Sequence, residues 1–394
     1  MKIIFIAGGT WQKPFVKYLK DKGHFLAVVN PIVTDTTLLS DYHIKADVSD
    51  LKEINKKIKI IKPSFITSDQ SDISTLTVAK LSEKWGLPGN KVETINKLTN
   101  KYSIYKLAKK IGIPVPETRL VKSVKNIFEF ANSHGFPIII KPTDATNSRG
   151  FRKIESYEEI TNDIFQSSLK FSKSKQVIVQ KFICGNMITL EGICSGKKHK
   201  TIASSKKNTY FKPGINSDIQ YPSDLPNEFL KSIIADNDKY VESTGMEFGL
   251  THSEYIINNN SHYLIEIGGR GGGAGITDKI TPWVSGVQSY DILYDSLIGQ
   301  TFDVKSLTVT EKPALLKYYQ KEDVANCTDE KIERIRNIKG VADFQFDFIG
   351  QQYVKDNNDT RHSMGIYLAE SEGGIKEIES FVKKELNNEP ISNS

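Results

Sequence analysis

The sequence of 394 residues predicts a mixed α/β and α+β fold with more than one domain. Three observations carry this prediction. Strand-like and helix-like segments alternate up to about residue 95, two apolar stretches flank a polar turn near residue 260, and a smaller mixed module follows residue 300. A chain of this length suggests two or three domains. We expect an N-terminal domain over residues 1–95, a central domain over 96–300 and a C-terminal α+β domain over 301–394.

The first 95 residues are predicted to form a doubly wound parallel sheet of Rossmann-like outline. Asp69 and Gln70 follow the third expected strand at its carboxyl end, where open α/β sheets bind ligands. We therefore expect both residues to frame a substrate pocket. The elements that predict this sheet are buried strands at Ile3–Ala7, Phe25–Val29 and Ser64–Thr67, a helix ending at Lys20 and a helix over Leu51–Ile61.

The pair Gly8-Gly9 after the first strand does not indicate dinucleotide binding. The Gly-x-Gly-x-x-Gly pattern is absent, and the second strand ends at Val29-Asn30-Pro31 without an acidic residue for a ribose. A tight turn required by packing is the favoured interpretation of these glycines.

The central and C-terminal regions mix helices and strands. A lysine-rich helix from Asn96 to Lys110 is expected to end at Gly112, which two prolines follow in an extended exit. Small and polar residues at 142–150 predict a loop directly after a strand. The other expected elements are strands at Phe136–Lys141 and Val177–Ile183, helical segments up to Gly299 and a helix at Gly373–Leu386.

Two acidic residues, Glu254 and Glu266, lie in apolar stretches on either side of the turn at Asn258–Ser261. A three-residue loop would place them directly opposite each other in an antiparallel hairpin. Like charges in that position destabilise a sheet. A divalent cation between them would remove the repulsion, and Mg²⁺ is usually held by one or two carboxylates plus substrate phosphates. An acidic hairpin face in water is the alternative.

Composition excludes several classes of protein. The net charge of +6 is spread along the chain, so it suits anionic small substrates but indicates no nucleic-acid-binding stripe. Three cysteines without metal-ligand spacing favour a reduced, cytoplasmic setting. The apolar run at the N-terminus is too short for a signal peptide, and no segment reaches the length of a membrane span. We expect a cytoplasmic protein without nucleic-acid or membrane partners.

Four ordered motifs resemble the ATP-grasp superfamily, and within it the carboxylate–amine ligase branch that includes biotin carboxylase, carbamoyl-phosphate synthase and the L-amino-acid ligases. The resemblance covers residues 1 to about 375 and is strongest between 96 and 275. The matching segments are Lys101 with Gly112-Ile-Pro-Val-Pro116, Ile140-Lys141 through Gly150, Val179-Gln-Lys-Phe-Ile-Cys-Gly185, and His252-Ser-Glu254 with Ile265-Glu266-Ile-Gly-Gly-Arg270.

The resemblance implies an ATP-grasp fold with a lid subdomain at about 115–183, and it implies roles for individual residues. Lys101 and Lys141 would bind ATP phosphates, Glu254 and Glu266 would hold Mg²⁺ or Mn²⁺, and Arg270 and Lys141 would be catalytic. Further nucleotide contacts implied are Thr146, Asn147, Ser148, Arg149, Gly150, Gln180, Lys181, Phe182, Ile183 and Glu191. Substrate contacts implied are Asp69, Gln70, Arg270, Gly271, Gly272 and Gly273.

Three positions depart from the family pattern. The family commonly has Glu where Gln180 stands and often has Glu at Met187, so Glu191 is the alternative ribose contact. Gly268 replaces an Asn of the metal motif, which removes one side-chain ligand and leaves the number of metal ions open.

The implied activity is ATP-dependent ligation of a carboxylate to an amine or ammonia through an acylphosphate, with release of ADP and phosphate. Two alternatives use the same ATP site: a phosphotransferase that releases a phosphorylated small molecule, and a non-catalytic ATP-binding protein. The expected partners are small-molecule carboxylate and amine substrates. The family also makes a homodimer possible, although nothing in the sequence tests it.

Overall fold

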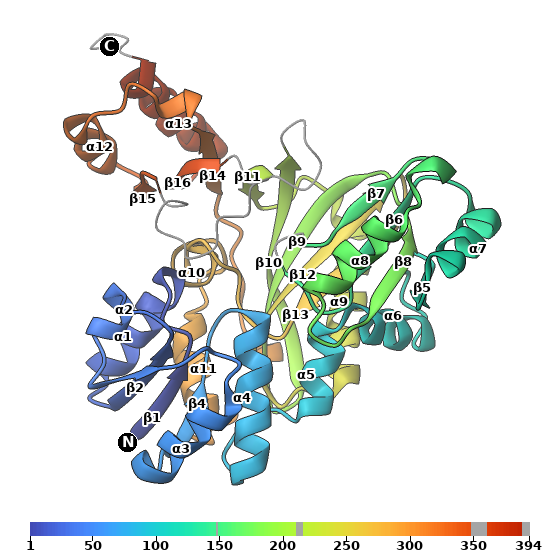
Figure 1. The fold of residues 1–394 in the computed structure, drawn as a ribbon. Helices are drawn as coiled ribbons and strands as arrows, with labels where there is room; N and C mark the ends of the chain where they lie inside the picture. The colour runs from blue at the N-terminus through green and yellow to red at the C-terminus, as the bar shows by residue number, and fades with distance from the viewer. Residues whose placement is uncertain (147–148, 210–215, 348–360, 388–394) are drawn as a thin grey trace.

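The computed structural model describes residues 1–146, 149–209, 216–347 and 361–387. Within these ranges the chain builds three sheets, each with helices against it (Figure 1). The predicted mixed α/β and α+β architecture is confirmed. Asn147 and Ser148, two of the expected nucleotide contacts, lie outside the described residues.

The N-terminal sheet is fully parallel and has the strand order β3-β2-β1-β4. Its strands are β1 (Lys2–Ile6), β2 (Phe25–Asn30), β3 (Tyr42–Lys45) and β4 (Phe65–Thr67), and its helices are α1 (Lys13–Asp21), α2 (Asp35–Leu38), α3 (Leu51–Ile61) and α4 (Asp72–Trp85), preceded by the 3₁₀ turn η1 (Thr10–Gln12). A Cβ on Gly8 would lie 2.8 Å from both Val28 and Thr37 side chains, so this glycine serves close packing, as the sequence favoured.

A second, smaller sheet has the order β5-β8-β6-β7 and is antiparallel throughout. Its strands are β5 (Thr118–Val121), β6 (Ile138–Pro142), β7 (Arg152–Ile154) and β8 (Val177–Lys181), with α7 (Val124–His134), η2 (Tyr157–Glu159) and α8 (Asn162–Phe171) around them. Ile138, Ile140 and Phe130 belong to a core of its own. Figure 1 shows this sheet at the edge of the molecule, away from the N-terminal sheet.

The third sheet has eight strands in the order β13-β12-β9-β10-β11-β14-β16-β15. The strands are β9 (Asn186–Ser195), β10 (Lys198–Thr209), β11 (Asn216–Tyr221), β12 (Phe248–Asn258), β13 (Ser261–Gly268), β14 (Ala314–Gln320), β15 (Val341–Gln345) and β16 (Arg361–Leu368). Three strands from the last hundred residues therefore continue a sheet that begins in the central region. The division into three domains remains a proposal.

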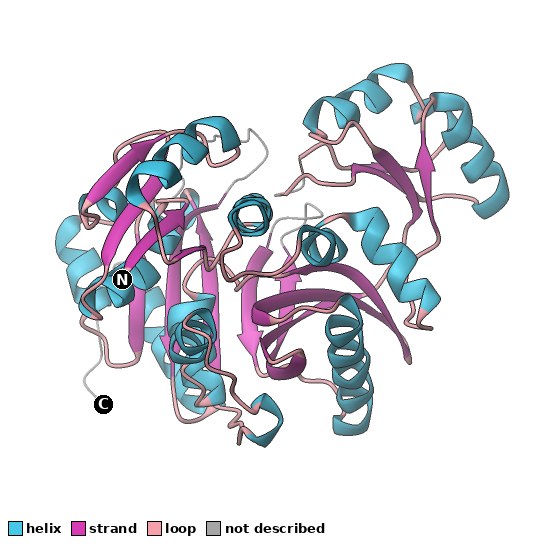
Figure 2. Ribbon diagram, turned by 90° about the horizontal axis from the view of Figure 1, so that it is seen from below, coloured by secondary structure: helices cyan, strands magenta, loops and turns pink. Residues whose placement is uncertain are grey.

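Helices cover both faces of this large sheet (Figure 2). On one face, Tyr255 of β12 and Leu264 of β13 pack with α5 (Val92–Thr99), α6 (Lys101–Lys110) and α9 (Asn227–Thr244). On the other, Leu293 and Leu297 pack between the large sheet and the N-terminal sheet. The elements there and beyond are η3 (Ile276–Ile280, π-helical), α10 (Thr281–Ser285), α11 (Ser289–Leu297), η4 (Val304–Ser306), η5 (Glu322–Val324), α12 (Asp329–Arg336) and α13 (Glu372–Asn387).

The expected helix from Asn96 to Lys110 is wrong in one respect, because two helices occupy this segment. The break lies at Asn100, whose backbone is extended and whose side chain accepts hydrogen bonds from the N–H groups of Tyr102 and Ser103. An N-cap of this kind satisfies donors that a helix start leaves free, so α6 begins at Lys101.

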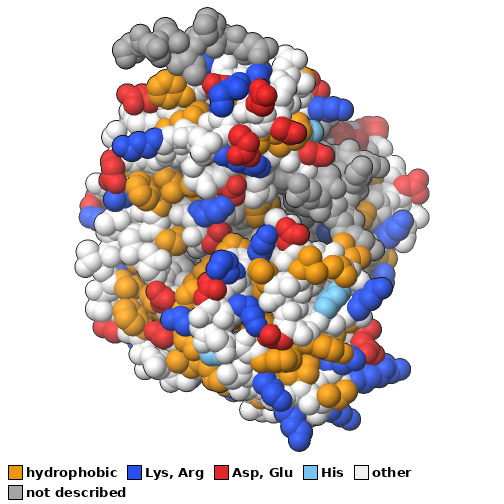
Figure 3. Space-filling view, turned by 90° about the vertical axis from the view of Figure 1, so that its left-hand side faces the viewer, with side chains coloured by type: hydrophobic (Ala, Val, Ile, Leu, Met, Phe, Trp, Pro, Cys, Tyr) orange, Lys and Arg blue, Asp and Glu red, His pale blue; other side chains and the backbone are white. Residues whose placement is uncertain are grey.

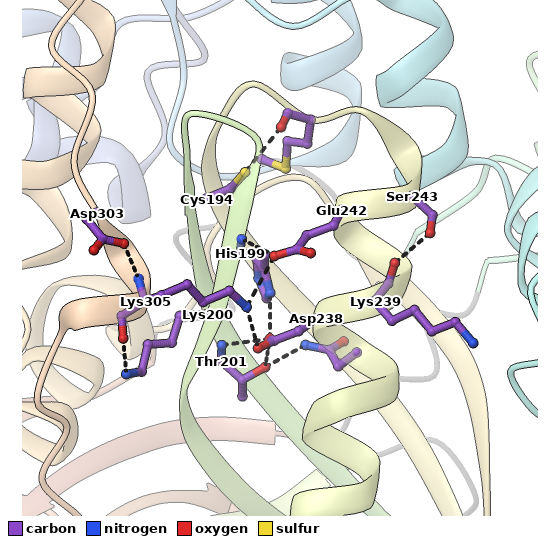
Figure 4. A network of polar contacts seen from close by, with 12 residues as sticks. Cys194, His199, Lys200, Thr201, Asp238, Lys239, Glu242, Ser243, Asp303 and Lys305 are labelled. Atoms are coloured by element: carbon purple, nitrogen blue, oxygen red, sulfur yellow. Dashed lines mark hydrogen bonds and ion pairs between the residues drawn. The ribbon is translucent and has the colours of Figure 1, made fainter.

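A polar network ties α9 to the large sheet (Figure 4). The ring of His199, which is fully buried, is hydrogen-bonded to Asp238 Oδ1 at 2.8 Å and to Thr251 Oγ1 at 2.7 Å. Thr201 donates to the same Asp238 oxygen from its backbone N–H and its hydroxyl, and Lys305 reaches the other oxygen. Both ring nitrogens of His199 are thus satisfied, as expected for a structural histidine.

Surface charge of both signs is interspersed with apolar side chains on the face shown in Figure 3. A search for membrane spans found no helix with the length and apolar character needed, within the described ranges.

Candidate active site

The hairpin formed by β12 and β13 brings Glu254 and Glu266 directly opposite each other. The predicted three-residue loop is wrong: Asn258 pairs with Ser261, so the loop has two residues. An irregularity after Glu254 adds one residue on β13, because Tyr255 pairs with Leu264 while Glu254 pairs with Glu266. The bulge compensates for the shorter loop and keeps both carboxylates on one face, opposite the face that buries Tyr255.

Two cations balance Glu254. Lys207 of β10 donates to its Oε1 at 2.7 Å, and His252 Nε2 lies 3.8 Å from the same oxygen. Burial opposes ionisation of this carboxylate, yet Lys207 and His252 hold the pKa of Glu254 well below its usual value. Burial would lower the pKa of His252, but Glu191 and Glu254 raise it to about 9. His252 is therefore an imidazolium at neutral pH.

Lys101 connects Glu266 to the loop after β6. Its ammonium group donates to Glu266 Oε1 at 3.2 Å and to the Ala145 carbonyl at 2.8 Å. The Lys101 side chain is 9% exposed, so this contact is largely shielded from water. Residues 142–146 open the loop that the sequence assigns as a phosphate cover, and Lys101 joins this loop to the hairpin.

Lys141 at the end of β6 is buried beside the same groups. Burial and the nearby Lys101 lower its pKa to about 8, against the opposing effect of Glu266 and Glu254. Its side chain donates no hydrogen bond to any part of the chain that the structure describes. A buried ammonium without a fixed partner is suited to receive an anionic ligand.

Arg270 lies at the junction between this site and the N-terminal region. Its Nε donates to Asp72 Oδ1 at 3.0 Å, and one terminal nitrogen donates to the Gly271 carbonyl. Burial would lower the pKa of Arg270, but Asp72 and Glu266 raise it further, so the guanidinium stays charged. Asp72 is the first residue of α4, which follows β4. Its bond to Arg270 therefore fixes the guanidinium group relative to the end of β4.

Asp69 and Gln70 lie immediately beside the glycine run that follows Arg270. The Gly271 N–H donates to the Asp69 carbonyl at 2.9 Å, and Tyr290 donates to Asp69 Oδ2 at 3.0 Å. Gly273 is near the Gln70 side chain, while Gly271 and Gly272 pack against Thr277 and Ile276. The residues expected to frame a substrate pocket thus meet in one place.

The other expected nucleotide contacts lie along the second sheet and its exit. Gln180 is buried and donates to Thr118, Lys181 is exposed, and Phe182 and Ile183 are half-buried. The Lys153 ammonium sits 4.3 Å above the Phe182 ring. Glu191 is buried in the large sheet, where one oxygen contacts His252 and Tyr221.

The loop 142–150 is described except for its two central residues. Thr146 and Arg149 are half-buried, and the Arg149 N–H donates to the Thr146 carbonyl. Gly150 is buried, and its carbonyl accepts from Ser168.

Sequence reasoning missed two members of this site, Lys207 and Tyr290. Both reach their partners from a strand or helix that is distant along the chain. Asp72 belongs to the segment after the third strand that the sequence places near a substrate pocket, but its bond to Arg270 was not predicted. No local pattern marked Tyr290.

The donor set fits a divalent cation only in part. Glu254 and Glu266 supply hard carboxylate oxygens on facing strands, as Mg²⁺ prefers. No cluster of three or more acidic, histidine or cysteine side chains suitable for a metal occurs among the described residues. The two glutamates therefore fit a metal that takes its remaining ligands from phosphates and water.

Comparisons with known proteins agree with this geometry. Residues 100–281 match the family model of the carbamoyl-phosphate synthase L chain, ATP binding domain. The carbamoyl phosphate synthase large chain of Vibrio cholerae is 21% identical over 324 residues, which is 78% of this chain but only 28% of that relative. The chain thus spans less than a third of that curated relative.

Solved structures confirm the ATP-grasp fold. The L-amino acid ligase of Bacillus licheniformis aligns with a TM-score of 0.79 and 13% identity, covering 98% of this chain and 97% of that chain. Biotin carboxylase of Campylobacter jejuni gives 0.74 and 14% identity, covering 95% and 89%. Phosphoribosylglycinamide synthetase of Anaerococcus prevotii gives 0.71 and 17% identity, covering 97% of each chain.

Proposed function

We propose that this ATP-grasp protein is an ATP-dependent ligase that joins a carboxylate to an amine through an acylphosphate. The observation that carries the proposal is the pair Glu254 and Glu266, which face each other and are each paired with a largely buried lysine. Five cationic side chains surround four carboxylates here, so the site has excess positive charge. The cations are Lys101, Lys141, Lys207, His252 and Arg270, and the carboxylates are Glu191, Glu254, Glu266 and Asp72. Such a balance favours a polyphosphate ligand.

The proposed reaction has two steps. The γ-phosphoryl group of ATP passes to an oxygen of the substrate carboxylate, which breaks the bond to ADP and forms an acylphosphate. The amine nitrogen then attacks the acyl carbon, its proton is released, and phosphate leaves with the electrons of the C–O bond. Phosphoryl transfer requires positioning and charge stabilisation rather than covalent help from the protein.

Different residues of the chain would supply this positioning and charge stabilisation. Lys101 and Lys141 would neutralise phosphate oxygens, and Arg270 would offer its planar fork to the transferred phosphoryl group or the substrate carboxylate. A bound Mg²⁺, held by Glu254 and Glu266, would supply further charge neutralisation at the phosphates. The loop 142–150 would cover the site, because an acylphosphate exposed to water hydrolyses.

The lowered pKa of Lys141 predicts that nucleotide binding depends on pH. Bound phosphates favour the ammonium form, whereas the free protein loses this proton as the pH rises through the lowered pKa of about 8. We expect the affinity for ADP, measured by calorimetry, to be constant between pH 6.5 and about 8 and to fall above it. Lys141→Gln should bind weakly, and its affinity should begin to fall only near pH 9, where His252 loses its proton. An unchanged affinity up to pH 10 in the wild-type protein would contradict the assignment.

We predict that the free protein binds divalent metal poorly, because the Lys207 ammonium group already donates to the Glu254 oxygen that would bind the metal. Lys207→Gln should bind Mn²⁺ about tenfold more tightly without nucleotide, the order expected for a largely buried ion pair. Electron paramagnetic resonance of free Mn²⁺ measures this directly. The matched control is Lys206→Gln, since Lys206 pairs with the exposed Asp224 instead. Equal Mn²⁺ affinity in both variants would refute the idea.

The decisive test of the activity is a screen for ADP release over carboxylates paired with amines, followed by mass spectrometry of the product. An amide that forms only with both substrates supports the ligase. Full ADP release with a carboxylate or alcohol alone, giving a phosphorylated product, would indicate the phosphotransferase. ATP binding without substrate-dependent ADP release would indicate a protein that only binds ATP.

A further inference from the structure

The side of the site toward the N-terminal sheet differs from the phosphate side in its chemistry. Here the end of β4, the glycine run and the π-helical turn η3 meet around Asp69, Gln70 and Asp278. Asp69 is 1% exposed and Gln70 is 3% exposed, whereas Asp278 is half-buried. The Gly271 N–H bonded to the Asp69 carbonyl places this cluster directly next to Arg270.

Hydrogen-bond acceptors without donors converge in this cluster. Asp69 Oδ1 is fully buried and has no hydrogen-bond partner in the described chain. The Gln70 amide donates to the Trp11 carbonyl at 2.9 Å and to Asp69 Oδ2 at 3.3 Å. Because both partners are acceptors, the orientation of this amide is determined, and its oxygen is left facing Gly273 without a donor from the described residues.

Asp278 adds a carboxylate that forms no ion pair with any side chain of the described residues, although the nearby Lys279 opposes the rise of its pKa. Lys279, its neighbour in sequence, forms an ion pair with Asp343 of β15 instead. Arg270 is engaged by Asp72. Across residues 1–146, 149–209, 216–347 and 361–387, no other side chain forms an ion pair with Asp278, and each buried acceptor left unsatisfied costs about 1–3 kcal/mol.

The raised pKa values of Asp69 and Asp278 agree with the lack of hydrogen-bond donors to Asp69 Oδ1 among the described residues. Burial raises the pKa of Asp69 to about 7, and Asp278 raises it further while Tyr290 opposes the rise. Burial also raises the pKa of Asp278, Lys279 opposes this rise, and Asp343 adds to it. On this side, Asp278 forms no ion pair with the described side chains, and Asp69 Oδ1 and the Gln70 amide oxygen accept no hydrogen bond from them. A ligand with positive charge and several N–H groups would satisfy both deficits.

We infer that Asp69, Gln70 and Asp278 form a subsite for a primary ammonium group of the acceptor substrate. This inference rests on the proposed ligase function and specifies its acceptor as a primary aliphatic amine. The ammonium group would donate to Asp278 and to the free oxygens of Gln70 and Asp69. The ammonium group would then lie beside Arg270, and it must lose one proton before its nitrogen can attack the acylphosphate.

Thermal unfolding in matched salts tests the subsite without knowledge of the full substrate. Methylammonium chloride should raise the melting temperature of the wild-type protein more than potassium chloride at equal concentration, by the mass action of a ligand that binds only the folded state. Potassium has the same charge but donates no hydrogen bond. The difference between the two salts should vanish in Asp278→Asn and in Asp69→Asn.

The matched control is Asp163→Asn, an exposed aspartate in the first turn of α8, which should keep the full difference. If Asp69→Asn fails to fold, the half-buried Asp278 decides the result. Equal shifts in both salts in the wild-type protein, or a full difference in Asp278→Asn, would overturn the subsite. The shift caused by Mg-ADP is measured in parallel. If Mg-ADP causes no shift, the ligase function is contradicted. The comparison of the two salts still decides whether the ammonium subsite exists.

Discussion

Glu266→Gln is expected to lower the turnover number for ligation by about 10²–10³-fold, the usual cost of removing one preorganised charge-stabilising group. Glutamine has the same shape, so the hairpin register and the bulge on β13 should persist. Lys101 keeps its bond to the Ala145 carbonyl in the variant. The loss should therefore appear in ADP release with the substrate pair found by the screen, while the melting temperature stays close to that of the wild type.

The control for this variant is Glu247→Gln. Glu247 forms an exposed ion pair with Lys197 and precedes β12, at the end of that strand remote from the turn and seven residues before Glu254, so turnover in this variant should be unchanged. Mn²⁺ binding in the presence of a non-hydrolysable ATP analogue gives a second measurement, since Glu266→Gln should weaken it. Turnover near the wild-type value would mean that Glu266 neither binds the metal nor stabilises charge in the reaction.

Asp238→Ala is expected to destabilise the protein by about 3 kcal/mol, the order found when a buried hydrogen-bonded partner is removed. Asp238 accepts from His199, from the Thr201 backbone N–H and from the Thr201 hydroxyl, and His199 is fully buried. Burial opposes ionisation of Asp238, yet the bond from His199 lowers its pKa. The interaction is therefore complete at neutral pH and is lost as the pH falls through that lowered pKa.

Urea unfolding followed by circular dichroism measures this loss as a shift of the midpoint. Asp224→Ala removes the exposed partner of Lys206 and should change stability by less than about 1 kcal/mol. Asp238→Asn retains an acceptor oxygen for His199 and should fall between the two. If Asp238→Ala unfolded at the same urea concentration as Asp224→Ala, the network would carry no stability.

Local patterns predicted the elements and much of the site. The helix at Leu51–Ile61 has the expected bounds, because apolar residues there recur at the helical period and Asp50 caps its start. The prediction that Glu254 and Glu266 lie opposite each other was also correct, although it assumed a loop of three residues. A loop one residue shorter and a bulge of one residue cancel, and sequence patterns rarely reveal a bulge.

Contacts between distant segments could not be predicted in the same way. The pairing of β11 with β14 joins residues about a hundred positions apart, and no periodicity within either strand specifies its neighbour. The same holds for Asp72 with Arg270, which are 198 positions apart. Such partners are selected by the packing of whole sheets, so a single sequence identifies the charged residues but not their pairing.

The separation of the small sheet from the large one has a mechanical consequence. Among the described residues, the small sheet is connected to the rest through the segments on either side of it, near Pro114 and Cys184. Both segments are hydrogen-bonded to the hairpin of Glu254 and Glu266: the Leu264 N–H donates to the Pro114 carbonyl, and Asn258 donates to the Cys184 carbonyl. The loop after β6 is bonded to α6 as well: the Lys101 N–H donates to the Thr143 carbonyl, and the Lys101 ammonium group donates to the Ala145 carbonyl. Because the same ammonium group also donates to Glu266, a displacement of the small sheet would change a contact at the carboxylate pair.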